Sequence, residues 1–500
     1  MIDDNNIHKD SLVENLTNES IELLEWPLFK KQLSSFASTS MGKKSIIDFE
    51  IPSKLEETQY LLDQTKEIYS LENEYDQNIN FEGVFDIKKN TETCFKGGVI
   101  SSIELLEIAD TIAAARNLKK TIINFELRPN LSSLLENLVD HIELEKILKN
   151  GIDNNGRISD RASPKLSELR KQLISIKNER RLILDQIIRK NGNYIQDAII
   201  SERVGRPVLA IKVNYINKFK GIIHDSSSSG NTIFIEPEAV VSKGNKIASC
   251  KAKIANEEFK LLRSWANLIS GNKDSLFLLS DILLSIENAH TRARYSRWIK
   301  GRPPKFESDL NIKITGFTHP LLLWENKNNH SHKITPIDFY IKENIKVVSI
   351  TGPNTGGKTA ALKGIGMALL MAKSGLFLPS NDQPVIPFYA NIYADIGDDQ
   401  SLQENLSTFS GHILRIKKIF EALSMKEGLS IVLLDEIGSG TDPEEGTALA
   451  ISLLEEFASQ SDLTVATTHY GEIKALKYKD SRFENVSVSF DEESLKPTYT

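Results

Sequence analysis

Eight consecutive residues, Gly352 to Thr359, have the types and spacing that bind a phosphate group. They read Gly-Pro-Asn-Thr-Gly-Gly-Lys-Thr and fit the pattern G-x-x-x-x-G-K-[ST]. Glycines let the backbone wrap around an anion, and the N–H groups at a helix N-terminus bind its charge. Lys358 would reach the β- and γ-phosphates of a nucleotide, and Thr359 would bind Mg²⁺. The pattern predicts a nucleotide site formed by Gly352, Pro353, Asn354, Thr355, Gly356, Gly357, Lys358 and Thr359.

Two acidic residues follow a second apolar run. Asp435 and Glu436 come directly after the segment Ile431–Leu434, which is typical of a buried strand. We expect Asp435 to hold Mg²⁺ through water and Glu436 to orient or deprotonate the attacking water. His469 ends a later apolar run, and we expect it to contact the γ-phosphate at the same sheet edge.

These residues need a scaffold that brings strand ends together. After Arg302-Pro303-Pro304 the sequence alternates between short β-branched runs and helical patterns. We therefore predict an α/β domain over residues 301–500, with a doubly wound parallel sheet. Its expected strands are 347–350, 391–396, 430–436 and 463–469, and its expected helices begin at residues 358, 410 and 447.

Helical patterns fill most of residues 19–300. Ser101 and Ser102 followed by Glu104 predict one helix start, and Ser163-Pro164 predicts another. The second helix has a coiled-coil seam formed by Leu166, Leu169, Leu173, Ile176, Arg180, Ile183 and Ile187. Its outer face carries the basic residues Arg170, Lys171, Lys177, Arg181, Arg189 and Lys190.

A small β-rich insertion interrupts the helices at about residues 190–238. Three short β-branched runs, at 208–213, 219–223 and 232–236, are separated by Asn, Ser and Gly. Helix resumes near Ala239 and continues to Lys300, with a break at Ser270-Gly271. We therefore predict an all-α core, a long helical lever and a β-rich tip.

Charge and composition narrow the class of protein. The chain has 500 residues and a net charge of −7, but residues 151–220 carry fifteen Lys and Arg against seven Asp and Glu, a local net of +8. Such a basic segment in an acidic protein indicates contact with a polyanion, although a solvated helix face explains the charge alone equally well. Two cysteines exclude a disulfide framework, and no apolar run is long enough for a membrane span. We expect a cytoplasmic protein whose residues 1–18 form a polar tail.

Six motifs occur in an order that resembles one known family. They are ISDRASPKLSELR, GIIHDSSSSGNTIFIEP, GPNTGGKT, ADIGDDQSLQENLSTFSGH, LLDEIGSGTDPEEG and ATTHYGEIK. This order is similar to the MutS family of ABC-type ATPases and, within it, to the bacterial "MutS two" branch. The resemblance extends from about Ile21 to the end of the sequence.

The resemblance implies several roles that the residue patterns alone do not give. ATP and Mg²⁺ would be the cofactors, and the working form would be a homodimer. Gln400 would couple ATP to the helical part, and Ser407 would contact the ATP of the partner subunit. Gly438–Asp442 would cross toward that subunit, and the β-rich tip would be a clamp that embraces nucleic acid.

Two functions are compatible with this resemblance. The first is a dimeric, ATP-hydrolysing clamp that binds branched or recombining DNA and restrains homologous recombination. The second is an ATPase that binds ribosomal RNA and splits stalled or collided ribosomes. Because the sequence starts directly with the helical core, we expect no counterpart of the mismatch-recognition domain of other relatives. The sequence also stops where "MutS two" relatives continue toward an Smr endonuclease domain, so we expect a truncated chain without nuclease activity.

Overall fold

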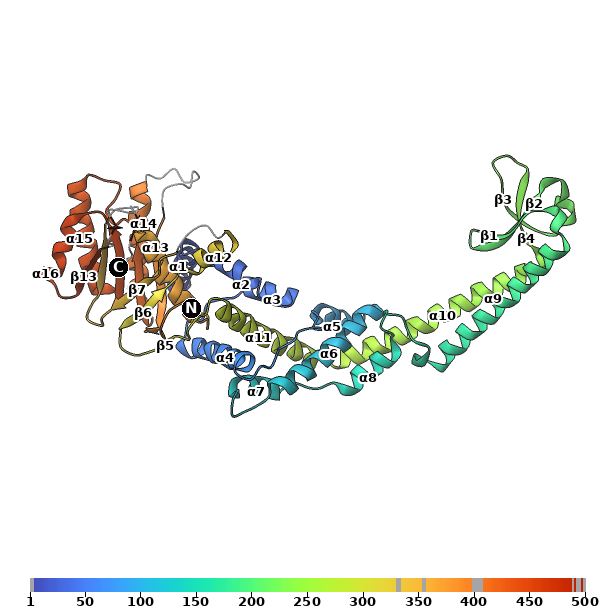
Figure 1. The fold of residues 1–500 in the computed structure, drawn as a ribbon, viewed down its shortest axis with the longest axis horizontal. Helices are drawn as coiled ribbons and strands as arrows, with labels where there is room; N and C mark the ends of the chain where they lie inside the picture. Colours follow the sequence, from blue (N-terminus) through green and yellow to red (C-terminus); the bar gives the residue numbers. More distant parts are fainter. Residues whose placement is uncertain are drawn as a thin grey trace. The chain divides into compact units, whose positions relative to one another are not determined.

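The computed structural model describes residues 4–329, 334–352, 357–397, 408–487, 490–491 and 496–497 (Figure 1). The chain forms two compact units and passes between them more than once. The larger unit consists of Met1–Glu82, Asn117–Leu138 and Asp281–Thr500, and the smaller unit consists of Gly83–Arg116 and Val139–Ser280.

A five-stranded parallel sheet organises the larger unit. Its order is β10-β11-β12-β8-β13. The strands are β8 (Val347–Thr351), β10 (Tyr389–Asp395), β11 (Leu429–Leu434), β12 (Leu463–Thr468) and β13 (Phe483–Ser487). The four strands predicted from apolar runs are confirmed. The edge strand β13 was not predicted, because Phe483 is its only fully buried side chain among those described.

Helices cover both faces of this sheet. Ile431 and Leu433 of β11 pack in one core with α13 (Lys358–Lys373). Val432 and Leu434 of the same strand pack in the opposite core with α14 (Thr408–Leu423) and α15 (Pro443–Gln460). The alternation follows from the two-residue period of a strand, and it confirms the doubly wound architecture.

Smaller elements complete this part of the chain. A second sheet has the order β5-β9-β6-β7; its strands β5, β6 and β7 precede β8 in sequence, and β9 follows α13. These further elements are β5 (Lys305–Phe306), β6 (Ile312–Phe317), α12 (Pro320–Asn329), β7 (Ile337–Ile341), β9 (Val385–Ile386), η5 (Gly471–Ala475), α16 (Leu476–Lys479), β14 (Phe490–Asp491) and β15 (Lys496–Pro497).

The N-terminal residues differ from the prediction of a polar tail over 1–18. Helix α1 (Asp4–Leu23) packs beside β10 and α14. Leu16 is buried in the same core as α14, and the hydroxyl of Ser20 accepts a 2.9 Å hydrogen bond from the backbone N–H of Ala394. A few apolar residues on one stripe are enough to hold a helix that is otherwise polar.

Helices α2 (Trp26–Ser34) and α3 (Ser40–Ile47) also pack in the core of the parallel sheet, and α4 (Leu55–Asn73) contacts α13. The larger unit further includes α7 (Pro129–Glu136) and the later part of α11 (Lys273–Trp298). Trp26, Phe29 and Tyr295 belong to the same apolar cluster as Ile350 of β8. The compact units therefore do not divide at residue 301, where the sequence pattern changes.

Five helices form the framework of the smaller unit. They are α5 (Lys88–Phe95), the first part of α6 (Ser102–Ile122), α8 (Ile142–Gly151), α9 (Pro164–Lys190) and α10 (Glu238–Gly271). Both predicted helix starts are confirmed. Ser101 donates its backbone N–H to Glu104 at 2.7 Å, and the hydroxyl of Ser163 accepts from the N–H of Leu166 at 3.3 Å.

The predicted seam on α9 faces α10, which runs alongside it (Figure 1). Leu166 and Leu169 are buried, and the remaining seam residues are half-buried. The outer face needs one correction. Arg170 is not a free cation, because it forms ion pairs with Asp160 at 2.5 Å and Glu258 at 2.7 Å. Besides Lys165, which forms an ion pair with Glu257, the exposed basic residues of α9 are Lys171, Lys177, Arg181, Arg189 and Lys190.

An antiparallel four-stranded sheet follows α9. Its order is β1-β2-β4-β3. The strands are β1 (Ile195–Arg203), β2 (Arg206–Lys212), β3 (Gly221–Ser226) and β4 (Thr232–Pro237), and short 3-10 helices lie at η1 (Asp160–Ala162), η2 (Gly192–Tyr194) and η3 (Val213–Lys218). β1 was not predicted, because two register shifts break its apolar alternation.

None of the helices in the described part of the chain combines the length and the apolar character that a bilayer span requires.

Candidate functional site

The first part of the site lies between β8 and α13. Gly352 follows the strand with φ +141°, and Gly357 precedes the helix with φ +79°. Side chains disfavour these backbone angles, so glycine fits both ends of the turn. Lys358 and Thr359 then open α13. Pro353, Asn354, Thr355 and Gly356 lie outside the described residues.

Lys358 places a cation at the carboxyl edge of the parallel sheet. Its side chain is buried, and the ammonium group donates to the carbonyl oxygens of Gly352 at 2.8 Å and Thr468 at 3.4 Å. Burial lowers the pKa of Lys358, and the nearby carboxylates of Asp435 and Glu436 partly oppose that effect. The strand ends thus bring together the cation and both acids that the sequence singled out.

Asp435 is held from two sides. The hydroxyl of Thr359 donates to Asp435 Oδ2 at 2.9 Å, and the hydroxyl of Thr467 donates to Oδ1. A threonine hydroxyl beside a carboxylate is the pair that holds Mg²⁺ in phosphate-binding ATPases. Among the described residues no cluster of three His, Cys, Asp or Glu forms a complete metal cage. Since Mg²⁺ usually takes one or two protein ligands plus phosphate oxygens, Thr359 and Asp435 fit this ion.

Glu436 adopts an unusual backbone conformation. Its φ is +47°, and its backbone N–H donates to the hydroxyl of Thr467 at 2.8 Å. A non-glycine residue in this region costs about 1–3 kcal/mol and often marks a functional position. Thr467 therefore supports both acids. This role of Thr467 was not predicted from the sequence. Its only sequence signal is its position two residues before His469.

His469 follows β12 at the same edge of the sheet. Its ring is exposed and lies against the ring of Tyr470, with centroids 4.2 Å apart. Tyr470 in turn donates its hydroxyl to the carbonyl of Gly438 at 2.9 Å. The structure thus places His469 near the ends of the central strands, and a contact with a phosphate stays a prediction.

A third acid at this edge was also missed. Asp395 ends β10, and its carbonyl accepts from the N–H of Asp435 at 2.8 Å. Its buried carboxylate pairs with His412 Nδ1 at 2.9 Å and Arg415 at 3.0 Å. The acid follows an apolar strand in sequence, which is the same signal that located Asp435.

The remaining predicted contacts are incompletely described. Gln400 and Ser407 lie outside the described residues. In the Gly438–Asp442 loop, Gly438 and Gly440 have φ of +84° and +87°, and Asp442 caps α15 by accepting from the N–H of Glu444 at 3.0 Å. The loop is thus fixed at its helical end, and its predicted approach to a second subunit is untested.

Comparison with known proteins agrees with this arrangement. Residues 348–500 match MutS domain V, and nearly the whole chain aligns with curated MutS proteins. Residues 348–500 thus form a MutS domain V, and the chain as a whole is similar to MutS2 proteins. Two relatives named Endonuclease MutS2 illustrate the similarity. The protein of Synechocystis sp. is 42% identical over 98% of this chain, and that of Symbiobacterium thermophilum is 36% identical over 97%.

Coverage of these MutS relatives is partial. The chain spans 62% of the Synechocystis protein and 60% of the Symbiobacterium protein. A third Endonuclease MutS2, from Halalkalibacterium halodurans, is 37% identical over 96% of this chain and 60% of its own length. MutS domain V includes Lys358, Thr359, Asp435, Glu436 and His469, so the family match and the geometry concern the same residues.

Proposed function

We propose that the larger unit binds ATP together with Mg²⁺ and hydrolyses the nucleotide. The observation that carries this proposal is the carboxylate of Asp435, which accepts from Thr359 and Thr467 beside the buried ammonium of Lys358. Because a carboxylate, a hydroxyl and a cation meet at the end of a phosphate-binding turn, a nucleoside triphosphate is the ligand that fits.

Each residue has a separate task in the proposed reaction. Lys358 neutralises charge on the β- and γ-phosphates. Thr359 and Asp435 hold Mg²⁺, which when bound withdraws charge from the phosphate oxygens. Glu436 orients the attacking water and accepts its proton. His469 contacts the γ-phosphate, Gln400 couples the bound ATP to the helical part, and Ser407 contacts the ATP of the partner subunit.

Two variants test the ATPase assignment. We expect Lys358→Ala to abolish ATP binding, because the phosphates then lose their main cation. We expect Glu436→Gln to bind ATP and hydrolyse it slowly, because the water is held without a base. Isothermal titration with ATP and Mg²⁺, followed by a phosphate-release assay, measures both effects. Equal ATP affinity of Lys358→Ala and wild type would rule out the site.

The second part of the proposal concerns the smaller unit, which we propose contacts nucleic acid. We propose that α9 and α10 form a lever, that the sheet β1–β4 forms a clamp, and that two copies of the chain enclose DNA and restrain recombination. The relatives' name Endonuclease MutS2 supports a nucleic-acid target. The exposed cations of α9 support contact with phosphates, since Lys and Arg supply most of the sequence-independent affinity for nucleic acids.

One experiment separates DNA from ribosomal RNA as the target. The chain is immobilised and incubated with cell extract at moderate salt, and the eluted nucleic acid is sequenced. DNA in the eluate supports the recombination clamp, whereas ribosomal RNA supports the ribosome-splitting alternative.

A second experiment tests the proposed dimer. Ser407→Arg should leave nucleotide binding intact and stop ATP-dependent dimerisation, which light scattering measures.

A further inference from the structure

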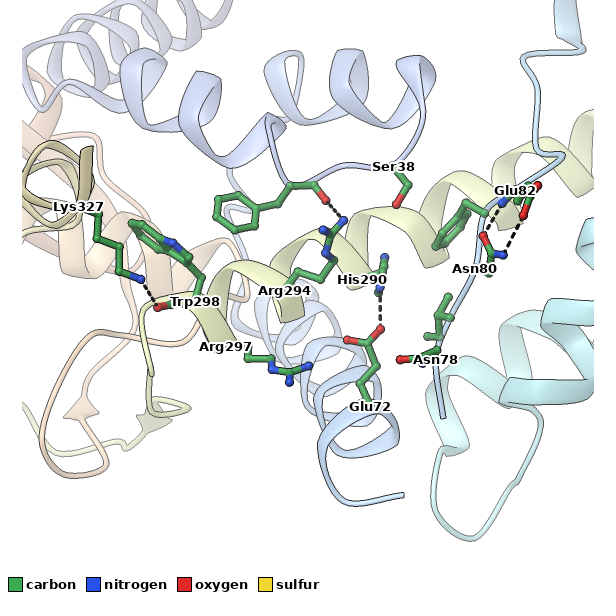
Figure 2. Close-up of a pocket in the computed structure, with 13 residues that line it drawn as sticks. Ser38, Glu72, Asn78, Asn80, Glu82, His290, Arg294, Arg297, Trp298 and Lys327 are labelled. Carbon is green, nitrogen blue, oxygen red and sulfur yellow. Dashed lines mark hydrogen bonds and ion pairs between the residues drawn. The ribbon is translucent and has the colours of Figure 1, made fainter. Parts of the chain in front are cut away.

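A pocket of about 900 Å³ lies in the larger unit and shares no residue with the site around Lys358 (Figure 2). One wall is a face of α11, where His290, Arg294 and Arg297-Trp298 recur at helical spacing. The segment between α2 and α3 and the residue Lys327 of α12 close other sides. Its size is that of a small-molecule site.

Three cations line this pocket. Arg294 donates to the carbonyl of Phe36 at 2.8 Å, and Lys327 lies 4.2 Å from the ring centroid of Trp298. None of the three forms an ion pair with a described carboxylate, and the guanidinium group of Arg297 has no described hydrogen-bond partner. Because Arg and Lys are the usual ligands of a phosphate group, the part of the pocket along α11 and α12 suits a phosphate.

The opposite end has a different chemistry. Residues 78–82 alternate between exposed and buried side chains. Ile79 and Phe81 anchor the segment, so that Asn78, Asn80 and Glu82 face outward along the pocket. Figure 2 shows Glu82 and Asn80 far from Lys327 and Trp298. Amide and carboxylate groups can accept from sugar hydroxyls and bind the edge of a base.

Glu72 and His290 also line the pocket. Glu72 bonds His290 Nε2 at 2.8 Å, so its charge is directed at the imidazole. His290 is 4% exposed, and its Nδ1 has no hydrogen-bond partner among the described atoms. Trp298 and Phe36 supply aromatic surface, with ring centroids 5.7 Å apart. Cations, aromatic rings and amides thus occur together in one concave surface.

We propose that this pocket is a second nucleotide site, which binds one phosphorylated nucleotide unit. The phosphate lies against Arg294, Arg297 and Lys327, and the sugar and base lie toward Asn78, Asn80 and Glu82. The unit comes either from a free nucleoside 5′-monophosphate or from the phosphorylated end of a strand. The proposal does not depend on ATP hydrolysis at Lys358.

Titration calorimetry with three probes tests the pocket. The probes are AMP, a 5′-phosphorylated tetranucleotide and the same tetranucleotide with a 5′-hydroxyl. AMP lacks the β- and γ-phosphates that Lys358 would bind, so it reports little on the first site. We expect the wild type to bind at least one phosphorylated probe, and the 5′-hydroxyl strand to bind at least about tenfold more weakly than its phosphorylated form.

Charge reversals identify the site of binding. The double variant Arg297→Glu, Lys327→Glu should bind the phosphorylated probe at least about tenfold more weakly than the wild type does, because two charge-assisted hydrogen bonds are lost. Both side chains are exposed, so the fold should persist. Arg263→Glu is the matched control, since Arg263 is exposed on α10 outside the pocket, and it should bind as the wild type does.

The outcomes are distinct. Tighter binding of AMP than of the phosphorylated strand indicates a free nucleotide, and the reverse indicates a strand end. Absence of binding by the wild type at millimolar probe overturns the proposal, and so does equal affinity of the double variant and wild type. Failure of ATP binding at Lys358 leaves these readouts unaffected, so the two proposals fail independently.

Discussion

The hydroxyl of Thr467 on β12 donates a hydrogen bond to Asp435 Oδ1 at the end of the neighbouring strand β11. The same hydroxyl oxygen accepts from the backbone N–H of Glu436 at 2.8 Å. One side chain therefore fixes the proposed Mg²⁺ ligand and the backbone of the proposed base. Because Thr467 is fully buried, water cannot replace either hydrogen bond without a rearrangement.

We predict that Thr467→Val lowers kcat for ATP hydrolysis by about tenfold to a hundredfold, because partners that orient metal ligands typically contribute that much. Thr464→Val is the control. Thr464 is equally buried on β12, but its hydroxyl bonds Ser461 at 2.7 Å at the other end of the strand. The two variants lose similar buried hydrogen bonds, so a steady-state ATPase assay separates catalysis from stability. Equal kcat in both would contradict the role of Thr467.

A pH dependence is predicted for His319, which directly precedes α12. Burial lowers the pKa of His319 to about 4, and neither ring nitrogen has a hydrogen-bond partner among the described atoms. The unfolded chain binds a proton at higher pH than the folded chain does. Stability is therefore fully present above about pH 6.5 and is lost as the pH falls toward 4, by about 3 kcal/mol at most.

Thermal unfolding between pH 7.5 and 4 measures this loss. We expect His319→Leu to flatten the decline of the melting temperature below pH 6.5, because the variant has no imidazole to protonate. An identical pH profile for wild type and variant would show that His319 is not the responsible group.

The β1–β2 turn offers a stabilising substitution. Val204 has φ +49° and is 94% exposed, and Gly205 follows it with φ +72°. A β-branched side chain is strained there, whereas Asn-Gly suits two successive positive φ angles. We predict that Val204→Asn raises the free energy of unfolding by about 1 kcal/mol. Ile199→Asn is the control, because Ile199 is 70% exposed without a positive φ and should give no gain. Chemical denaturation compares the two variants.

The proposed clamp predicts a salt-dependent effect. Reversing Arg181, Arg189 and Lys190 to Glu should weaken binding to every duplex or RNA sequence, and each lost phosphate contact should lower the log–log salt slope by about one. Reversing Lys43, Lys44 and Lys54, which are exposed in the larger unit, changes the net charge equally and should leave binding intact. Fluorescence anisotropy at three salt concentrations measures both. Parallel slopes with equal affinity for the first variant and wild type would contradict contact between α9 and the polyanion.

Local patterns predicted most of the elements and the strand ends of the site. Proline after Ser163 marked the start of α9, and short runs rich in apolar and β-branched residues marked β8, β10, β11 and β12, because each signal comes from neighbours in sequence. Asp435 and Glu436 could be found for the same reason. The ion pair of Arg170 with Glu258 could not be predicted, since the two residues are distant in sequence.

Long-range pairings limited the rest of the prediction. Thr467 supports Asp435 only because β11 and β12 are neighbours in the sheet, and a threonine at the end of an apolar run is unremarkable in sequence. The helix α1 was read as a polar tail, because its burial depends on β10 and α14, which form far along the chain. Sequence periodicity does not show which surface a segment from a distant part of the chain will cover.

The interleaving of the two compact units has a consequence for biosynthesis. Trp26 and Phe29 leave the ribosome early, yet they pack in one core with Ile350 and Leu433. At about 5–20 residues per second, they wait roughly 15 to 80 seconds for those partners. During that interval, the smaller unit can fold from Gly83–Arg116 and Val139–Ser280 while the N-terminal helices still expose apolar side chains. Expression of residues 301–500 alone would therefore yield a sheet whose core lacks the N-terminal helices that cover it. During synthesis of the whole chain, the need for chaperones should be highest before residue 350 is made.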